Sequence, residues 1–316
     1  MLTIFRKILR ARDCRSEWEI VYGVVEDKEL KLNAFLPTDG TKPVPAIVEI
    51  HGGWWHTGDA AQKIEDVEGC KIFRRRGVAV FSIQYRLGKT GGFPESIRDC
   101  RNAIRFIRKN AKRFNIDGDL IGVTGFSAGG HLGAMVAMVP ENFEDGGPLS
   151  GLEGVSAKVS GCFSYSLPTD LGRFWDQGLD DVVHHADETV TFREANSEIR
   201  FDPRPRLRTL FHGITPETKE HRILYDRMSP WGHIRKSIPP LLICDGEKDP
   251  VVPGLHGKAL YEALKKGGAD VTYWMSVNGE HCFPSGKGFE KTLDRFLEKI
   301  FKLSPHHLLK NKSNMI

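Results

Sequence analysis

Three features that would place this protein in a broad class are missing from its sequence. It has no run of about 18 apolar residues, so we expect no membrane-spanning helix and no membrane partner. Its six cysteines include no C-x-x-C pair, so we expect reduced cysteines and no metal site. No other cofactor is expected either. Its net charge is only +4 and its basic residues are scattered, so we expect no nucleic-acid partner.

The N-terminal segment also lacks the uninterrupted apolar core of a signal peptide, because Arg6, Lys7, Arg10 and Arg12 interrupt it. We therefore expect a cytoplasmic protein, and a signal trimmed from the sequence is the alternative. The densest basic clusters, at 74–76 and 98–113, are interpreted as solvated faces of helices.

A serine stands at the most informative position in the chain. The segment Thr124–Gly130 joins an expected strand, Leu120–Thr124, to an expected helix, Ala128–Val139. A G-x-S-x-G pattern between a strand and a helix is typical of a nucleophile elbow, with Ser127 at the tip of a strained turn. The flanking glycines avoid Cβ atoms that would crowd the neighbouring backbone. Ser127 is therefore the candidate nucleophile, although the bare pattern also arises by chance.

A second motif supports this interpretation. The residues His51–Trp55 read His-Gly-Gly-Trp-Trp and follow the apolar run Val44–Ile50. Glycines at a strand end let the backbone turn its N–H groups outward, and such donors stabilise the oxyanion of an acyl-transfer reaction. The candidate donors or substrate-binding residues are Gly52, Gly53, Trp54 and Ala128. An ordinary tight turn is the alternative.

An acid and a base follow in the chain order that this chemistry uses. Asp245, Glu247 and Asp249 lie in a loop after a buried strand, and His281 lies in a loop after the next strand. Asp249 is the better acid, because Pro250 holds the residue before it extended and its side chain in the loop. A solvated carboxylate and a surface histidine are the alternatives. Cys282, next to His281, is interpreted as a packing neighbour.

Strands and helices alternate along the chain, which predicts an α/β fold with a mostly parallel sheet and helices on both faces. An antiparallel pair is expected to open the sheet. Beyond the elements given above, the expected strands are Trp18–Val25, Leu30–Phe35, Ala46–Ile50, Val78–Gln84, Val155–Phe163, Leu241–Cys244 and Val271–Val277. The expected helices are Lys63–Arg75, Glu95–Phe114, Leu255–Lys266 and Gly288–Phe301.

The alternation stops over about 167–230, a polar stretch that contains several aromatic residues and the pair His184–His185. We expect a mainly helical cap inserted over the site of a single domain spanning 1–316, and a peripheral excursion is the alternative. The paired histidines lack further ligands at matching helical spacing, so no metal is expected there either.

The whole motif set resembles the α/β-hydrolase esterases related to hormone-sensitive lipase, and within them the bifunctional feruloyl and acetyl-xylan esterase-like group. The resemblance covers roughly residues 18–302 apart from the middle segment. It rests on His51-Gly-Gly-x-Trp55-x-x-Gly58-Asp59, Gln84–Leu87, Asp99, Gly125–Leu132 and Glu247–Pro253. It implies an α/β-hydrolase fold with Ser127 as nucleophile, His281 as base, Asp249 as its orienting acid, and an oxyanion hole at the His-Gly-Gly turn and Ala128.

One position departs from the family pattern. Trp54 stands where the family commonly has a third glycine, and a bulky residue would be strained there at positive φ. In this respect the motif resembles that of kynurenine formamidase-type hydrolases, which have an aromatic residue between the glycines and the tryptophan. An amidase therefore remains an alternative.

The expected function is hydrolysis of short-chain esters, acetyl to butyryl, through an acyl-enzyme. The substrate is a small molecule or a carbohydrate that bears acetyl or feruloyl groups. The alternatives are an arylformamidase or amidase and a non-catalytic scaffold that only binds a ligand. The scaffold is disfavoured because nucleophile, acid and base are all present.

Overall fold

The computed structural model describes residues 14–37, 42–60, 67–143, 146–176, 202–281 and 283–303. The strands are β1 (Cys14–Val25), β2 (Lys28–Pro37), β3 (Val44–Ile50), β4 (Ala79–Ile83), β5 (Ile116–Phe126), β6 (Cys162–Tyr165), β7 (Leu241–Gly246) and β8 (Val271–Ser276). The helices are α2 (Val67–Arg74), α3 (Glu95–Lys109), α4 (Ala111–Phe114), α5 (Ala128–Met138), α7 (Arg204–Leu210), α8 (Lys219–Arg227), α9 (Leu255–Lys266) and α10 (Phe289–Phe301). Two 3₁₀ turns are η2 (Gly88–Thr90) and η4 (Pro230–His233).

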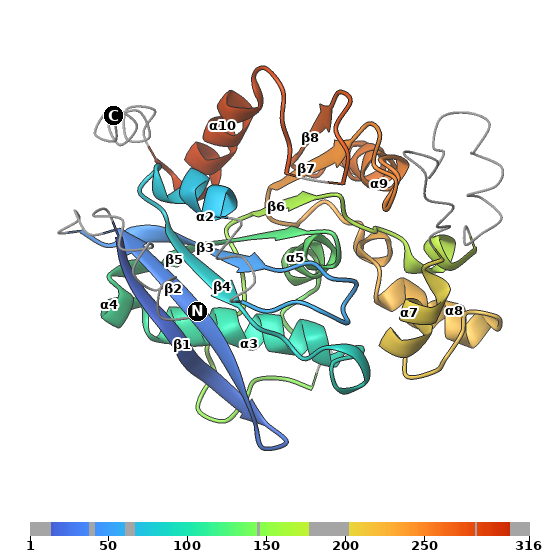
Figure 1. Ribbon diagram of the computed structural model, residues 1–316, viewed down its shortest axis with the longest axis horizontal. Coiled ribbons are helices and arrows are strands. Elements are labelled where there is room, and N and C mark those ends of the chain that lie inside the picture. The colour runs from blue at the N-terminus through green and yellow to red at the C-terminus, as the bar shows by residue number, and fades with distance from the viewer. Residues whose placement is uncertain are drawn as a thin grey trace, which may run out of the picture.

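The strands form one sheet in the order β1-β2-β4-β3-β5-β6-β7-β8 (Figure 1). β1 pairs antiparallel with β2, as expected, and β2 pairs antiparallel with β4. The remaining neighbours are parallel, so the ends of β3, β5, β7 and β8 that precede the candidate site residues share one edge of the sheet. This arrangement is the α/β-hydrolase fold.

Alternate side chains of the central strands enter two different cores, as in a parallel sheet that is covered on both faces. Val48 and Ile50 face a core shared with α3, α5 and α9, whereas Ile47 faces a second core shared with α2 and α10. Figure 1 shows α3 and α5 on one side of the sheet and α2 and α10 on the other. Helices on both faces were predicted from the alternation of elements.

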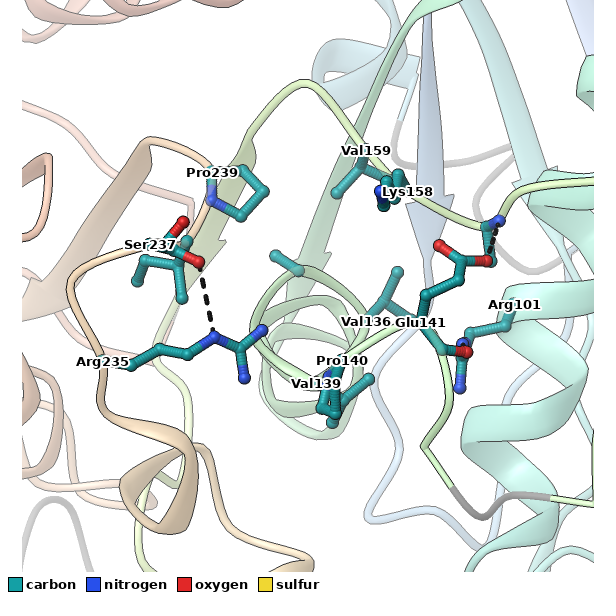
Figure 2. Close-up of a pocket in the computed structure, with 13 residues that line it drawn as sticks. Arg101, Val136, Val139, Pro140, Glu141, Lys158, Val159, Arg235, Ser237 and Pro239 are labelled. Carbon is teal, nitrogen blue, oxygen red and sulfur yellow. Dashed lines mark hydrogen bonds between the residues drawn. The ribbon is translucent and has the colours of Figure 1, made fainter.

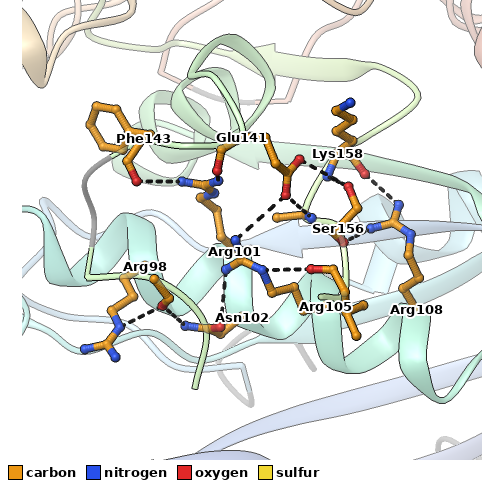
Figure 3. A network of polar contacts seen from close by, with 12 residues as sticks. Arg98, Arg101, Asn102, Arg105, Arg108, Glu141, Phe143, Ser156 and Lys158 are labelled. Atoms are coloured by element: carbon orange, nitrogen blue, oxygen red, sulfur yellow. Dashed lines mark hydrogen bonds and ion pairs between the residues drawn. The ribbon is translucent and has the colours of Figure 1, made fainter. Parts of the chain in front are cut away.

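The strand expected at Val155–Phe163 is wrong over most of its length, because β6 begins only at Cys162. Arginine side chains hold the backbone of the preceding segment, as Figure 3 shows. Arg105 Nε donates to the Val155 carbonyl (3.1 Å), and Arg108 donates to the carbonyls of Ser156 and Lys158. Side-chain donors therefore bind these carbonyls in the segment before β6.

The solvated helix faces expected at the basic clusters are likewise wrong for three arginines. Arg76, Arg101 and Arg105 are each less than 5% exposed. Arg101 donates to the carbonyl of Glu141 (2.6 Å), and Arg76 pairs with Asp294 (2.6 Å). These side chains stabilise the fold by binding carbonyl and carboxylate oxygens. The expected helix Glu95–Phe114 is also interrupted at Asn110, between α3 and α4.

The described parts of the middle segment are helical. Residues 171–176, α7, α8 and η4 contain the helical turns, and α7 and α8 lie next to one another (Figure 1). The rings of Phe211 and Tyr225 stack with centroids 3.6 Å apart, which joins the two helices. No helix among the described residues is long and apolar enough to span a membrane.

Candidate active site

Ser127 lies between the last residue of β5 and the first residue of α5, at the position predicted for a nucleophile elbow. Its backbone has φ 55° and ψ −121°, a sparsely populated conformation for any residue other than glycine. Its N–H donates to the Tyr165 carbonyl at 3.0 Å, which fixes the turn to the end of β6. The strain expected from the sequence is therefore present.

The glycines around Ser127 are required by close contacts, as predicted. A Cβ on Gly125 would lie 2.2 Å from the Gly129 carbonyl oxygen, and a Cβ on Gly129 would lie 2.0 Å from the Ile50 carbonyl oxygen. Real Cβ atoms do not approach oxygen so closely. The first turn of α5 thus packs directly on the end of β3, which brings the His-Gly-Gly turn beside the serine.

Asp249 and His281 are in direct contact. His281 Nδ1 lies 2.7 Å from Asp249 Oδ2, although 32 residues separate the two in sequence. The other carboxylate oxygen accepts the N–H groups of Val251 (2.8 Å) and Val252 (2.9 Å). Asp249 is only 1% exposed, so its carboxylate is held by hydrogen bonds rather than by water.

The two competing carboxylates lie elsewhere. Glu247 accepts the N–H of Asn278 at 2.8 Å, which ties two loops together. Asp245 is 2% exposed and its carboxylate packs on Gly257 of α9, where a Cβ would lie 2.2 Å from Oδ2. Burial raises the pKa of Asp245 well above its ordinary value, and the neighbouring Asp249 raises it further.

The ring of Phe126 connects the histidine to the serine. Its centroid lies 4.6 Å from that of His281, and Phe126 immediately precedes Ser127. Gly52 approaches the same residue, because a Cβ on Gly52 would lie 3.0 Å from Phe126 Cδ1 and 3.4 Å from Ser127 Cβ. The structure therefore gathers the serine, the histidine with its carboxylate, and the glycine turn at one edge of the sheet.

The glycine turn has left-handed backbone at three successive residues. The φ angles are 103° at Gly53, 58° at Trp54 and 59° at Trp55. Such a conformation costs a bulky residue on the order of 1–3 kcal/mol, so the surroundings must hold it. Among the described residues, the N–H groups of Gly53 and Ala128 have no hydrogen-bond acceptor, which leaves them able to bind an oxyanion.

The two tryptophans of the turn have different surroundings. The Trp54 ring stacks on Phe174 of the middle segment at 6.0 Å with an interplanar angle of 7°. The Arg206 guanidinium lies 5.6 Å from the centroid of the same ring. Trp55 is completely buried, and its indole N–H donates to His131 Nδ1 at 3.2 Å.

The segment Gln84–Leu87, directly after β4, supports the turn at residues 51–55. Tyr85 stacks on His51 with centroids 4.4 Å apart, and its hydroxyl donates to the His51 carbonyl at 3.0 Å. Arg86 donates from Nε (2.8 Å) and Nη2 (3.0 Å) to the fully buried carboxylate of Asp99. The Gln84–Leu87 motif and Asp99 thus serve as a rigid support for residues 51–55.

Sequence reasoning missed two contributors, His131 and Phe174. The sequence showed His131 only as part of the motif Gly125–Leu132 and did not indicate a separate role for it. Phe174 lies in a segment without clear periodicity, so no pattern indicated that it would contact the turn. Cys282 and the pair His184–His185 lie outside the described residues. The residues that the structure describes contain no group of three or more His, Cys, Asp or Glu side chains that could hold a metal ion.

A separate cavity of about 270 Å³ opens at the opposite end of α5. Its walls are formed by the last turn of α5 and by the segments that precede β6 and β7 (Figure 2). Arg235 lies at its side and donates to the Ser237 carbonyl at 3.3 Å. Of the described residues, those that line this cavity include none of the candidate site residues.

Comparison with known proteins identifies the family of the chain. The family model of BD-FAE matches residues 32–264, which is more than half of the chain. The chain belongs to the BD-FAE family. A catalytic triad and an oxyanion hole are typical of this family.

Curated relatives of this BD-FAE member include a protein named as an esterase and one named as a xylanase. Esterase LipC of Mycobacterium tuberculosis is 25% identical over 289 residues, covering 89% of this chain and 62% of the relative. Endo-1,4-beta-xylanase B of Butyrivibrio fibrisolvens is 26% identical over 272 residues, covering 84% of this chain and 35% of that protein. The chain therefore spans less than two thirds of the length of these relatives.

Solved structures show the same fold. Esterase 2 of Thermogutta terrifontis superposes with a TM-score of 0.66 at 27% identity, covering 93% of this chain and 94% of that one. A bifunctional GH43-CE protein of Bacteroides eggerthii superposes with a TM-score of 0.73 at 26% identity, covering 90% of this chain and 38% of that one.

Proposed function

We propose that this protein is a serine carboxylesterase with Ser127, His281 and Asp249 as its catalytic triad. The observation that carries the proposal is the 2.7 Å contact between His281 Nδ1 and Asp249 Oδ2 beside the strained elbow of Ser127. A carboxylate at Nδ1 holds the proton on that nitrogen, so Nε2 is the base. The membership of the BD-FAE family and the esterase names of the relatives support the same activity.

In the first half of the reaction, Ser127 Oγ attacks the ester carbonyl carbon while His281 Nε2 takes the hydroxyl proton. The carbonyl oxygen becomes an oxyanion, which accepts hydrogen bonds from the N–H groups of Gly53, Trp54 and Ala128, with Gly52 shaping the turn. The tetrahedral intermediate then breaks its bond to the alcohol oxygen. The alcohol leaves with the proton from His281, and the acyl group stays on Ser127.

In the second half, water replaces the alcohol. His281 takes a proton from the water, the oxygen attacks the acyl carbon, and the carboxylic acid leaves as the proton returns to Ser127. Asp249 orients the imidazole and stabilises its charged form in both halves. Every proton-transfer step uses side chains of this chain.

We propose short acyl groups, acetyl to butyryl, as the substrate class, on a small molecule or a carbohydrate. A form of Thermogutta terrifontis esterase 2 at 25% identity is described with propionate bound. The xylanase and GH43-CE names favour a carbohydrate ester. In this proposal the segment 167–230 acts as a cap, and its described parts contribute Phe174 and Arg206 beside Trp54.

A fluorophosphonate probe tests the proposal, because it phosphonylates only an activated serine. Thermogutta terrifontis esterase 2 is described as phosphonylated by sarin, which makes the probe class appropriate. Labelling of Ser127, located by peptide mass spectrometry, is expected, and labelling should disappear in Ser127→Ala. An unlabelled wild-type protein that still binds esters would support the non-catalytic scaffold instead.

A substrate panel then separates the activities. p-Nitrophenyl esters, acetylated xylan, methyl ferulate and N-formylkynurenine are compared by kcat/KM. The highest value is expected for an acetyl ester. A preference for N-formylkynurenine over every ester would overturn the esterase assignment in favour of an arylformamidase.

A further inference from the structure

The turn Gly53–Trp55, called the oxyanion turn below, has left-handed backbone at all three residues. It needs a restraint, because the N–H groups of Gly53 and Trp54 must point to one place. Trp55 is the last of the three and is completely buried. Its ring meets the ring of His131 edge-on, with centroids 5.2 Å apart and an interplanar angle of 90°. The indole N–H donates to His131 Nδ1 at 3.2 Å. The turn is therefore anchored to α5 by a hydrogen bond between two fully buried side chains.

His131 also forms a hydrogen bond to the middle segment. Its Nε2 lies 2.6 Å from the Met228 carbonyl oxygen. An indole nitrogen only donates, so Nδ1 accepts, and the proton of the neutral ring is on Nε2, where it is donated to Met228. Burial lowers the pKa of His131 to about 4, which agrees with a neutral ring at ordinary pH.

Further hydrogen bonds fix His131 itself and the backbone next to Met228. His131 lies one turn after the nucleophile, and its N–H donates to the Ser127 carbonyl at 2.9 Å. Ser229, next to Met228, donates to the Tyr225 carbonyl (2.7 Å) and accepts the N–H of Leu171 (2.8 Å). The chain of hydrogen bonds thus joins the oxyanion turn, the helix that carries Ser127, and the two sides of the cap segment.

We infer that Trp55 and His131 are positioning residues, which set the oxyanion turn at a fixed place relative to Ser127 and tie it to the cap through Met228. This inference rests on the proposed esterase function. Neither side chain touches the ester. They act through the N–H groups of Gly53 and Trp54, which bind the oxyanion only as it forms. Loss of the restraint therefore affects the transition state more than substrate binding.

The test compares Trp55→Phe with Trp18→Phe. Trp55→Phe keeps an aromatic ring and removes the N–H donor, whereas Trp18 lies on β1 and contacts Phe35 edge-on at 5.3 Å. For Trp55→Phe we expect kcat for p-nitrophenyl acetate to fall about 10- to 100-fold with KM changed less than about threefold. Trp18→Phe is expected to keep wild-type kinetics. A folded Trp55→Phe enzyme with unchanged kcat would overturn the inference.

A transition-state analogue separates positioning from general loosening. Ser127 Oγ adds to the carbonyl carbon of an alkyl trifluoromethyl ketone, its proton passes to His281, and the carbonyl oxygen becomes a hemiketal oxyanion. The affinity for this ketone should fall in Trp55→Phe by the same factor as kcat/KM. A fall in kcat with unchanged affinity would also overturn the inference, because the oxyanion site would then be intact.

Two variants of His131 complete the design. His131→Gln can accept from Trp55 through Oε1 and donate to Met228 through Nε2, so it should recover most of the activity. His131→Leu can do neither and should resemble Trp55→Phe. Equal loss in both variants would show that only the imidazole volume matters and would contradict the inference.

The unmodified protein gives a readout that does not depend on how the variants fold. In a ¹H–¹⁵N spectrum, the Trp55 indole N–H should be protected from solvent exchange, and it should shift when the trifluoromethyl ketone binds. An unprotected indole N–H would refute the anchor. Failure of the proposed function is seen separately, as absence of fluorophosphonate labelling and ester turnover in the same sample.

Discussion

His281 Nδ1 and Asp249 Oδ2 are 2.7 Å apart, and the second oxygen of that carboxylate is already occupied by the N–H groups of Val251 and Val252. The two backbone donors prevent the carboxylate from rotating away from the ring. The imidazole is therefore held in one orientation, with Nε2 directed away from Asp249. In the proposed triad, this orientation leaves Nε2 as the base.

Asp249→Asn is expected to lower kcat by roughly 10⁴, because an amide N–H can face Nδ1 and stabilise the tautomer that leaves Nε2 protonated. The side chain keeps its size, so the fold should survive. Steady-state kinetics with p-nitrophenyl acetate measure the effect, and the unfolding midpoint verifies the fold.

Asp245→Asn is the matched control. Asp245 is equally buried but packs on Gly257, and its raised pKa favours a neutral carboxyl that asparagine replaces closely. Activity should fall far less than in Asp249→Asn. The reverse ranking would move the triad acid to Asp245.

Ser127→Ala is expected to reduce hydrolysis by on the order of 10³-fold or more, leaving only the contribution of the oxyanion hole and binding. Alanine shortens the side chain without changing the elbow, whose φ of 55° is already imposed by the packing around it. Active-site labelling and turnover should both disappear while the circular dichroism spectrum stays unchanged. Near-normal turnover in this variant would contradict the assignment of Ser127.

The sequence was sufficient for the features that depend on local pattern. A strand-to-helix junction predicted the place of Ser127, and the loops after two later strands predicted the places of Asp249 and His281. Parallel strands present their carboxyl ends at one edge of the sheet, so all three lie at that edge. The glycine spacing around Ser127 predicted the close backbone contacts that the structure has. Asp249 was chosen over Asp245 and Glu247 because those two lie closer to the strand and because Pro250 follows Asp249. In the structure, Asp249 Oδ2 lies 2.7 Å from His281 Nδ1. The catalytic role of each residue stays a prediction.

Features that depend on long-range side-chain contacts could not be predicted. The arginines of α3 were expected in solvent, but Arg105 and Arg108 instead bind carbonyls about 50 residues away, in the segment before β6. Trp55 and His131 are 76 residues apart, so no periodicity links them. Phe174 meets Trp54 only because the middle segment folds back over the turn. The cytoplasmic location and the single-domain boundary stay predictions.

Stability should fall as the pH drops from about 7 toward 5. Burial lowers the pKa of His131 and of His256 to about 4, whereas a histidine in the unfolded chain titrates near pH ~6.5. Between these values the unfolded chain binds more protons than the folded one. The contribution of each buried ring to the free energy of unfolding, on the order of 3 kcal/mol, is therefore fully present above pH ~6.5 and is lost as the pH falls toward 4.

Urea unfolding at several pH values between 7 and 5 measures this dependence. His131→Gln should show a shallower fall with pH than the wild type, because one of the two buried rings is gone. His212→Gln serves as the control, since its side chain is 46% exposed. Equal slopes in all three proteins would show that the buried rings do not govern acid stability.

Acyl-chain length should be limited by Trp54. Its indole stands at the oxyanion turn, stacked on Phe174 and covered by the Arg206 guanidinium. We therefore expect this aromatic pair to close the space beside the acyl carbon. We expect acetyl to butyryl esters to be cleaved well and chains beyond about eight carbons poorly, since each added methylene gains at most ~0.8 kcal/mol where room exists and clashes where it does not.

Trp54→Gly tests the cause of this limit. Glycine adopts the left-handed backbone of residue 54 without strain and keeps the N–H donor, so the oxyanion hole should persist while the indole volume is removed. The kcat/KM for p-nitrophenyl octanoate should therefore rise relative to that for the acetate. Specificity constants that already climb from acetate to palmitate in the wild type would show that Trp54 does not close the acyl site, and would indicate a lipase, whose long substrate needs a continuous apolar groove.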